Sequence, residues 1–281
     1  KCATGAQGVL VQDMAHEALR AHATPGGGGS GGARVLAMGL ADGETGIITQ
    51  PPDRIDGQWP CGPARADLLC LDVTQAVGRI PFSFAWSGAD MAILSAHKLG
   101  GPKGTGALIL RHGVEIPALA RGGGQETGRR SGTENIIGIM GFGAAAAASQ
   151  RDLEAGDWAR VEKLRNILEK ALEESAKDII FIGRNVNRLP NTSCFAVPGW
   201  KGETQVMQMD LAGFAVSAGS ACSSGKARPS RVLQAMGHDD RTAASAIRVS
   251  LGPTTTEDEL LRFATAWIAA HGKHKARARP E

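Results

Sequence analysis

Short apolar stretches that end in polar residues or glycines constrain the fold of this 281-residue chain more than any other feature. In the first half, four such stretches predict β-strands: 35–40, 66–73, 89–94 and 104–111. A long apolar stretch from 135 to about 149 predicts a helix. Because strand and helix patterns alternate, the sequence indicates an α/β protein with a mostly parallel sheet.

The second half continues this alternation in shorter elements. Its clearest helix spans 157–175, where one face is apolar: Val161, Leu164, Leu168 and Leu172. Strands are expected at 179–182, 193–197, 215–217 and 247–251, and helices at 203–211, 229–236, 239–246 and 256–271. We therefore expect two domains, a large one at 1–150 with glycine-rich loops and a smaller α+β domain at 151–281.

Three segments near the N-terminus complete the expected organisation. Apolar residues at helical spacing predict an amphipathic helix over 9–21. The glycine run at 26–32 has the composition of a flexible linker, and it is either an exposed loop or an artificial join. The segment 51–65 is rich in proline and glycine without periodicity, which predicts a loop.

Reactive side chains follow the apolar run at 89–94. Ser95, His97 and Lys98 come first, and Gly100 and Gly101 then turn the chain. Ligands of open α/β sheets bind at the carboxyl ends of the strands. A lysine amine in that place can act as a nucleophile, although a lone loop lysine is more often a solvated surface residue.

Other groups can join Lys98 in one crevice. Asp72 ends the preceding strand, and Ser95, His97 and Thr133, the last just before a helix, can hold a phosphate. An aldehyde cofactor would form a Schiff base with Lys98 and pair its ring nitrogen with Asp72. Alone, Asp72 is more often a cap and Thr133 an N-cap. Together they predict pyridoxal phosphate.

Cys222 lies among small residues in the segment 218–225, a loop that can move and expose its sulfur. The alternative is a small buried residue. The other four cysteines are scattered without a CxxC pair: Cys2, Cys61, Cys70 and Cys194. This usage excludes a disulfide framework and a zinc site, and it indicates a reducing, cytoplasmic compartment with at most one functional thiol.

Five motifs occur in an order that resembles the cysteine desulfurases: 71–75, 95–104, 130–133, 220–225 and 247–252. These enzymes belong to the class V aminotransferase-like group of fold type I pyridoxal phosphate enzymes. The resemblance covers nearly the whole chain. The cysteine loop is similar to that of the nitrogen-fixation and housekeeping desulfurases that supply iron–sulfur cluster assembly.

The resemblance implies roles around the cofactor. Lys98 would be the Schiff-base lysine and the later proton shuttle, and Asp72 would face the pyridine nitrogen. Gln75 would bond the phenolic oxygen of the ring. Ser95 and His97 would hold the phosphate.

The resemblance also implies roles in substrate binding and assembly. Thr133 would reach the cofactor phosphate of a neighbouring subunit, so a homodimer is expected. Arg248 would grip the carboxylate of L-cysteine with its planar guanidinium. Cys222 would attack the substrate sulfur, giving alanine and an enzyme persulfide for a scaffold or other sulfur-acceptor protein.

Two departures from the family pattern affect these expectations. Asp42 and Gly43 stand where the family has two asparagines, so an amide that contacts cofactor and substrate is missing and Asp42 adds negative charge. The chain opens at Lys1 without the family's preceding segment, which carries a phosphate loop and a ring-stacking histidine. We therefore expect an N-terminally truncated chain that binds pyridoxal phosphate poorly.

Charge and hydropathy exclude other classes. The net charge is +3, and the basic residues of the tail at 273–279 more than account for it, so the rest of the chain is nearly neutral and no nucleic-acid partner is expected. No apolar run is long enough for a membrane span. The remaining alternatives are a selenocysteine lyase or other class V enzyme, which the thiol loop disfavours, and a non-catalytic derivative that keeps only docking surfaces.

Overall fold

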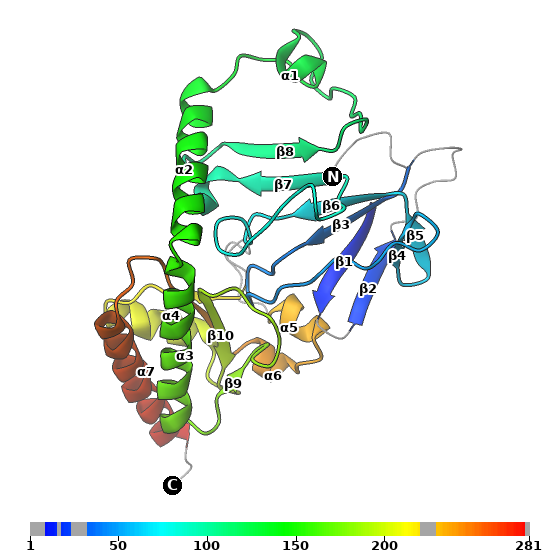
Figure 1. The fold of residues 1–281 in the computed structure, drawn as a ribbon. Helices are drawn as coiled ribbons and strands as arrows, with labels where there is room; N and C mark the ends of the chain where they lie inside the picture. Colours follow the sequence, from blue (N-terminus) through cyan, green and yellow to red (C-terminus); the bar gives the residue numbers. More distant parts are fainter. Residues whose placement is uncertain (1–8, 16–17, 24–32, 220–228, 279–281) are drawn as a thin grey trace. The chain divides into compact units, whose positions relative to one another are not determined.

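The computed structural model describes residues 9–15, 18–23, 33–219 and 229–278 (Figure 1). Within these residues the chain divides into two compact units. The first contains 9–14, 19–23, 33–40 and 49–151, and the second contains 15, 18, 41–48, 152–219 and 229–278. The chain therefore leaves the first unit after residue 40, contributes 41–48 to the second unit, and returns to the first unit at 49.

A six-stranded sheet forms the first unit, in the order β2-β1-β3-β6-β7-β8. Its strands are β1 (Val9–Ala15), β2 (Ala18–Ala23), β3 (Val35–Gly39), β6 (Leu68–Asp72), β7 (Met91–Ser95) and β8 (Gly106–Leu110). The pairs β1–β3, β3–β6 and β6–β7 are parallel, and β8 runs antiparallel to β7. The four strands expected in the first half and the mostly parallel sheet are thus confirmed.

The central strands are apolar because the sheet buries them. Leu36, Leu69, Leu71 and Ala92 have no exposed surface. A parallel strand covered on both faces gains from such a continuous apolar run, since each leucine contributes about 1.5–3 kcal/mol when it leaves water. The edge strand β8 differs, because Leu108 is 44% exposed.

The helix predicted over 9–21 is wrong, because strands β1 and β2 occupy this segment. The backbone of Val9, Leu10 and Val11 pairs in register with that of 35–37. Valine suits an extended backbone, and pairing with a neighbouring strand outweighs helical spacing in so short a segment. The glycine run at 26–32 lies outside the described residues.

The loop predicted at 51–65 is partly wrong, because it contains a short antiparallel hairpin of β4 (Trp59–Cys61) and β5 (Ala64–Ala66). The fully buried carboxylate of Asp90 holds this region to the sheet. It accepts hydrogen bonds from the Leu69 N–H at 2.7 Å and from the Trp59 ring N–H at 3.4 Å, and Arg111 pairs with it at 2.6 Å. Three-residue strands carry too little periodicity for sequence reasoning to find.

Helical segments follow β7 and β8. The 3₁₀ helix η1 (Ala96–Leu99) comes directly after β7, and α1 (Gln125–Gly128) and the long α2 (Ile136–Glu154) come after β8. Two glycines allow close packing against α2 within the first unit. A Cβ on Gly101 would lie 3.3 Å from the Ala145 Cβ, and one on Gly78 would lie 2.8 Å from the Ser149 Oγ. The loops after β6 and β7 therefore both contact α2.

The second unit is a four-stranded antiparallel sheet, β11-β12-β10-β9, with helices packed on it. Its elements are α3 (Asp157–Ser175), β9 (Ile180–Phe181), β10 (Thr192–Ala196), α4 (Gly202–Leu211), β11 (Ser217–Ala218), α5 (Arg231–Ala235), α6 (Asp240–Ala243), β12 (Ala246–Ser250) and α7 (Glu257–Ala278). Most match their predicted positions within a few residues. The apolar faces of α3 and α7 meet the sheet around Phe195, Trp200 and Trp267.

Segment 41–48 packs into this second unit. Ile47 is 2% exposed, and the Leu189 N–H donates to the Gly46 carbonyl at 2.7 Å. Gly46 has a φ of 76°, and a Cβ there would lie 2.7 Å from Thr192, so only glycine fits without a shift. No helix among the described residues is both long and apolar enough to cross a bilayer.

The tight loop after β6 generates a stability prediction. Gly78 and Gly57 both have a φ of 77°, but a Cβ at Gly78 would lie 2.8 Å from the Leu99 side chain, whereas nothing lies within 4 Å at Gly57. Gly57→Ala should cost about 1–2 kcal/mol through its left-handed backbone alone. Gly78→Ala should cost about 1–3 kcal/mol more because it also overpacks the loop. Thermal denaturation of the two variants measures the difference, and equal losses would contradict this packing.

Candidate active site

Two neighbouring parallel strands bring polar side chains to one edge of the first unit's sheet. Asp72 ends β6 and pairs in register with Ile93 of β7, and Ser95 ends β7 two residues further on. His97 and Lys98 follow in η1. Because parallel strands end at the same edge, the structure brings these four residues together at the position where α/β sheets bind ligands.

Asp72 points its carboxylate toward solvent and is oriented by its own turn. The side chain is exposed, and its Oδ1 accepts a hydrogen bond from the Thr74 N–H at 2.9 Å. This bond holds the short side chain in one direction. This bond uses only one of the two carboxylate oxygens, and the other faces solvent, where it can meet a ligand.

The loop that bears Gln75 is joined to the segment that bears Lys98 by one side chain. The Arg79 guanidinium donates to the Gln75 carbonyl at 3.0 Å and to the Lys98 carbonyl at 2.8 Å. Burial lowers the pKa of Arg79 from its ordinary value. Gln75 and Lys98 are both half-buried.

Ser95 and His97, which are expected to hold a phosphate, lie at the start of η1, but the helix does not use their side chains. Ser95 is the N-cap residue of η1, but its side chain makes no capping hydrogen bond, and His97 is exposed. A hydroxyl, an imidazole, an amine and a carboxylate at one sheet edge are the groups that an aldehyde, a phosphate and a pyridine nitrogen require. The residues present therefore fit pyridoxal phosphate.

Thr133 is exposed and lies three residues before α2. The interpretation of Thr133 as an N-cap is wrong, because the Asn135 Oδ1 accepts the Gly138 N–H at 3.0 Å and caps the helix instead. The helix therefore leaves the Thr133 hydroxyl unused. Nearby, Arg130 pairs with Glu126 at 3.1 Å and donates to the Gly132 carbonyl at 2.6 Å, which orders the loop that carries Thr133.

Arg248 lies in β12 of the second unit, where two neighbours orient its guanidinium. Its Nη1 donates to the Gly43 carbonyl, and its Nη2 donates to the Ser217 Oγ at 3.2 Å. Ser217 is also the strand partner of Arg248 in the sheet. The Nε is buried and has no partner among the described residues, so this planar group keeps donors for a carboxylate.

The turn at 42–46 includes an acid that sequence reasoning missed. Glu44 is 4% exposed, and both of its carboxylate oxygens are shielded from solvent. Burial raises the pKa of Glu44, and the Asp42 charge adds to this, whereas Ser230 and Arg248 oppose it. An acidic residue in a glycine-containing turn resembles a solvated loop residue, so no signal in the sequence could have found it.

Asp42 is held by its own turn. Its Oδ1 accepts hydrogen bonds from the N–H groups of Glu44 at 3.0 Å and Thr45 at 2.6 Å, and from the Thr45 hydroxyl at 2.8 Å. Asp42 therefore stabilises the turn, and the side-chain oxygen of an asparagine could accept the same hydrogen bonds. Gly43 has no side chain to supply the missing amide, although its carbonyl accepts a hydrogen bond from Arg248.

The described cysteines are poor nucleophiles. Cys61, Cys70 and Cys194 are buried in the core, and none of them forms a disulfide among the described residues. Burial raises the pKa of Cys61 and Cys194, and the Glu44 charge adds to the increase at Cys194, so the reactive thiolate is disfavoured. Cys222, the predicted persulfide cysteine, lies outside the described residues.

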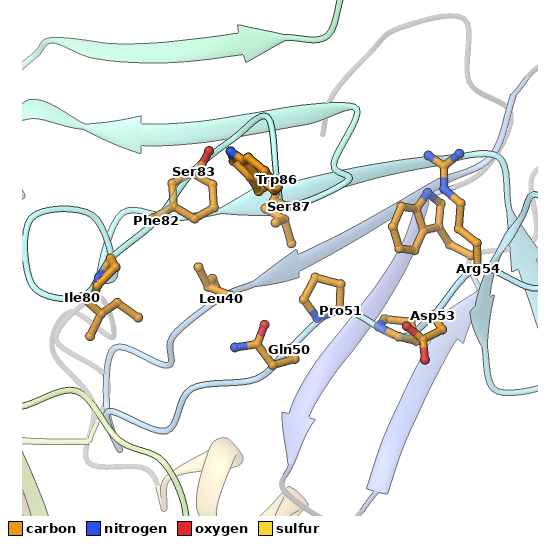
Figure 2. A pocket seen from close by; sticks show the side chains of 14 residues that line it. Leu40, Gln50, Pro51, Asp53, Arg54, Ile80, Phe82, Ser83, Trp86 and Ser87 are labelled. Atoms are coloured by element: carbon orange, nitrogen blue, oxygen red, sulfur yellow. The ribbon is translucent and has the colours of Figure 1, made fainter.

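A cavity of about 400 Å³ lies within the first unit (Figure 2). Trp86, Phe82, Pro51 and Arg54 are among the residues that line it, and they come from the loops after β3 and β6. None of the predicted site residues described above lines it. The described residues also contain no group of three or more metal-ligating side chains.

Comparison with known proteins identifies the family of this fold and site. The aminotransferase class-V family matches residues 32–263, so the chain belongs to this family. It is 41% identical over 249 residues to a cysteine desulfurase of Cereibacter sphaeroides, covering 88% of this chain and 60% of that one. It is 45% identical over 196 residues to a cysteine desulfurase of Gluconacetobacter diazotrophicus, covering 69% and 48% respectively.

A solved structure agrees with this assignment. The NifS-like protein of Rickettsia africae has a TM-score of 0.72 at 29% identity, covering 85% of this chain and 62% of that one. The chain spans about half to three fifths of the length of these relatives. The expected resemblance to cysteine desulfurases and the expected fold type I architecture are therefore confirmed, and the family uses pyridoxal phosphate.

The buried acid beside Arg248 generates a pH prediction. Because the pKa of Glu44 is raised above its usual 4.5, the folded protein keeps a proton that the unfolded chain has released as pH rises above 4.5. The contribution of Glu44 to the free energy of unfolding is therefore full below pH 4.5 and is lost as pH rises toward the raised pKa. Glu44→Gln removes this loss. The free energy of unfolding of the variant minus that of wild type should therefore be larger at pH 7 than at pH 4.

Urea denaturation of both proteins between pH 4 and pH 8 tests this sign. Glu115→Gln is the control, because Glu115 is an exposed glutamate. A difference between Glu44→Gln and wild type that stays constant across this pH range would contradict a raised pKa at Glu44.

Proposed function

We propose that this chain is the greater part of a cysteine desulfurase that converts L-cysteine to L-alanine. The observation that carries the proposal is the convergence of Asp72, Ser95, His97 and Lys98 at the ends of two parallel strands in a class-V family member. When bound, pyridoxal phosphate supplies an electron sink for the substrate carbons. Asp72, Gln75, Ser95, His97, Lys98 and Thr133 are the residues that would hold it.

Each residue has a task that matches its chemistry. Asp72 would pair with the ring nitrogen of the cofactor, and the Thr74 N–H already orients its exposed carboxylate. Lys98 would hold the cofactor through its amine and would move protons at the substrate carbons. Arg248 binds the substrate carboxylate, since Gly43 and Ser217 already fix the plane of its guanidinium.

The sulfur step belongs to Cys222. Its thiolate attacks the substrate sulfur, an S–S bond forms, and the carbon–sulfur bond breaks. The electron pair of that bond stays on carbon, which takes a proton and becomes the methyl group of alanine. The enzyme is left with a persulfide on Cys222, which it passes to an iron–sulfur scaffold or another sulfur-acceptor protein.

The organisation that goes with this activity is also part of the proposal. Residues 1–150 would be the pyridoxal phosphate-binding domain in part, and 151–281 the small domain that carries the cysteine loop. Thr133 would serve the cofactor of a second subunit in a homodimer, because its hydroxyl is exposed and unused by α2. A reducing, cytoplasmic location is part of the proposal, and the lack of a disulfide at Cys61 and Cys194, two of the described cysteines, agrees with it.

One assay separates this function from its alternatives. The chain is incubated with pyridoxal phosphate and L-cysteine, and sulfide and alanine are measured. With the cofactor in large excess, as the expected weak binding requires, we expect both products, and we expect Cys222→Ser and Lys98→Ala to abolish them. Cys61→Ser is the matched control, since its buried thiol should not be needed.

The other outcomes have distinct meanings. Product that does not require Cys222 would indicate a selenocysteine lyase or another class V reaction. An absence of cofactor uptake would indicate a non-catalytic relative.

A further inference from the structure

We propose that Arg79 is a positioning residue that fixes the Lys98 segment against the Gln75 loop for cofactor binding. The role of this contact in cofactor binding rests on the proposed function, but the contact itself does not. One guanidinium donates to two main-chain carbonyls, of Gln75 at 3.0 Å and Lys98 at 2.8 Å. Each carbonyl belongs to a residue that would touch the cofactor.

The Lys98 carbonyl needs a donor from outside its own helix. The last carbonyls of a helix have no intrahelical partner. In η1 the N–H groups of Gly100 and Gly101 both turn back to the Ala96 carbonyl, and Gly100 has a left-handed φ of 86°. The Lys98 carbonyl is therefore left to Arg79, which caps this end of η1 as basic side chains cap helix C-termini.

The backbone of the Gln75 loop is shaped to bring Arg79 within reach. Gly78 has a φ of 77°, and a Cβ on it would lie 2.8 Å from the Leu99 side chain. The absence of a side chain therefore lets the loop lie against η1 directly before Arg79. A half-buried guanidinium must be compensated by acceptors, and the two carbonyls supply them.

The shape of arginine explains why one residue can do this. Its planar fork presents separate N–H donors to two acceptors in fixed directions, whereas the lysine ammonium is a compact group on a flexible stem. Arg79→Lys keeps the charge and most of the volume, but it should lose the simultaneous hold on both loops. The amine of Lys98 would then sample more directions relative to Asp72 and Gln75.

The test uses the full chain and begins without cofactor. Hydrogen–deuterium exchange of the peptide spanning 96–101 should be about tenfold faster, or more, in Arg79→Lys than in wild type, because charge-assisted hydrogen bonds are lost. Arg151→Lys is the matched control, since Arg151 is exposed on α2. Exchange in β3, a buried strand of the same unit, should not change and shows that the unit carrying Arg79 is folded in the variant.

The second measurement adds pyridoxal phosphate and follows its visible absorbance and occupancy by titration. We expect Arg79→Lys to bind about tenfold more weakly and to show a shifted band. Unchanged exchange at 96–101 would overturn the proposal, and so would faster exchange with an unchanged band and affinity. If wild type takes up no cofactor but exchange at 96–101 is still faster in Arg79→Lys, the structural role of the contact stands and the proposed function fails instead.

Discussion

The parallel pairing of β6 with β7 is the constraint on which the rest of the first unit depends. It aligns Leu71 with Ala92 inside the core and Asp72 with Ile93 at the edge. The same register that buries the apolar residues therefore delivers the carboxylate next to the segment that carries Lys98. A shift of one residue would place Asp72 opposite Ala92 in the core or Leu71 opposite Ile93 at the edge, so the packing energy of the sheet also fixes the position of the site.

The loops after β6 and β7 are also held in place, so the residues at the strand ends keep their alignment. Gly78 and Gly101 allow both loops to pack closely on α2. At the opposite end, Asp90 lies directly before β7, and its carboxylate holds β6 through the Leu69 N–H and the end of β8 through Arg111. The two strands are thus fixed at both ends. Arg79 then joins the loops by hydrogen bonds rather than by apolar contact.

Much of this was predictable because it depends on local patterns. The apolar runs of β3, β6 and β7 and the helical spacing of α3 are properties of single segments, and the motif after β7 follows from its residue types. The strands β1 and β2 were not predictable, since they depend on pairing with β3. Glu44 and Arg79 were missed for a related reason, because their burial and contacts arise between segments that are separate in the sequence.

The central claim is that the edge formed by β6 and β7 holds pyridoxal phosphate through Lys98. The most direct measurement is borohydride reduction of the chain after incubation with pyridoxal phosphate, followed by peptide mass mapping. The account predicts that the pyridoxyl group is found on Lys98. A group found instead on the exposed Lys103, or spread over surface lysines, would contradict it.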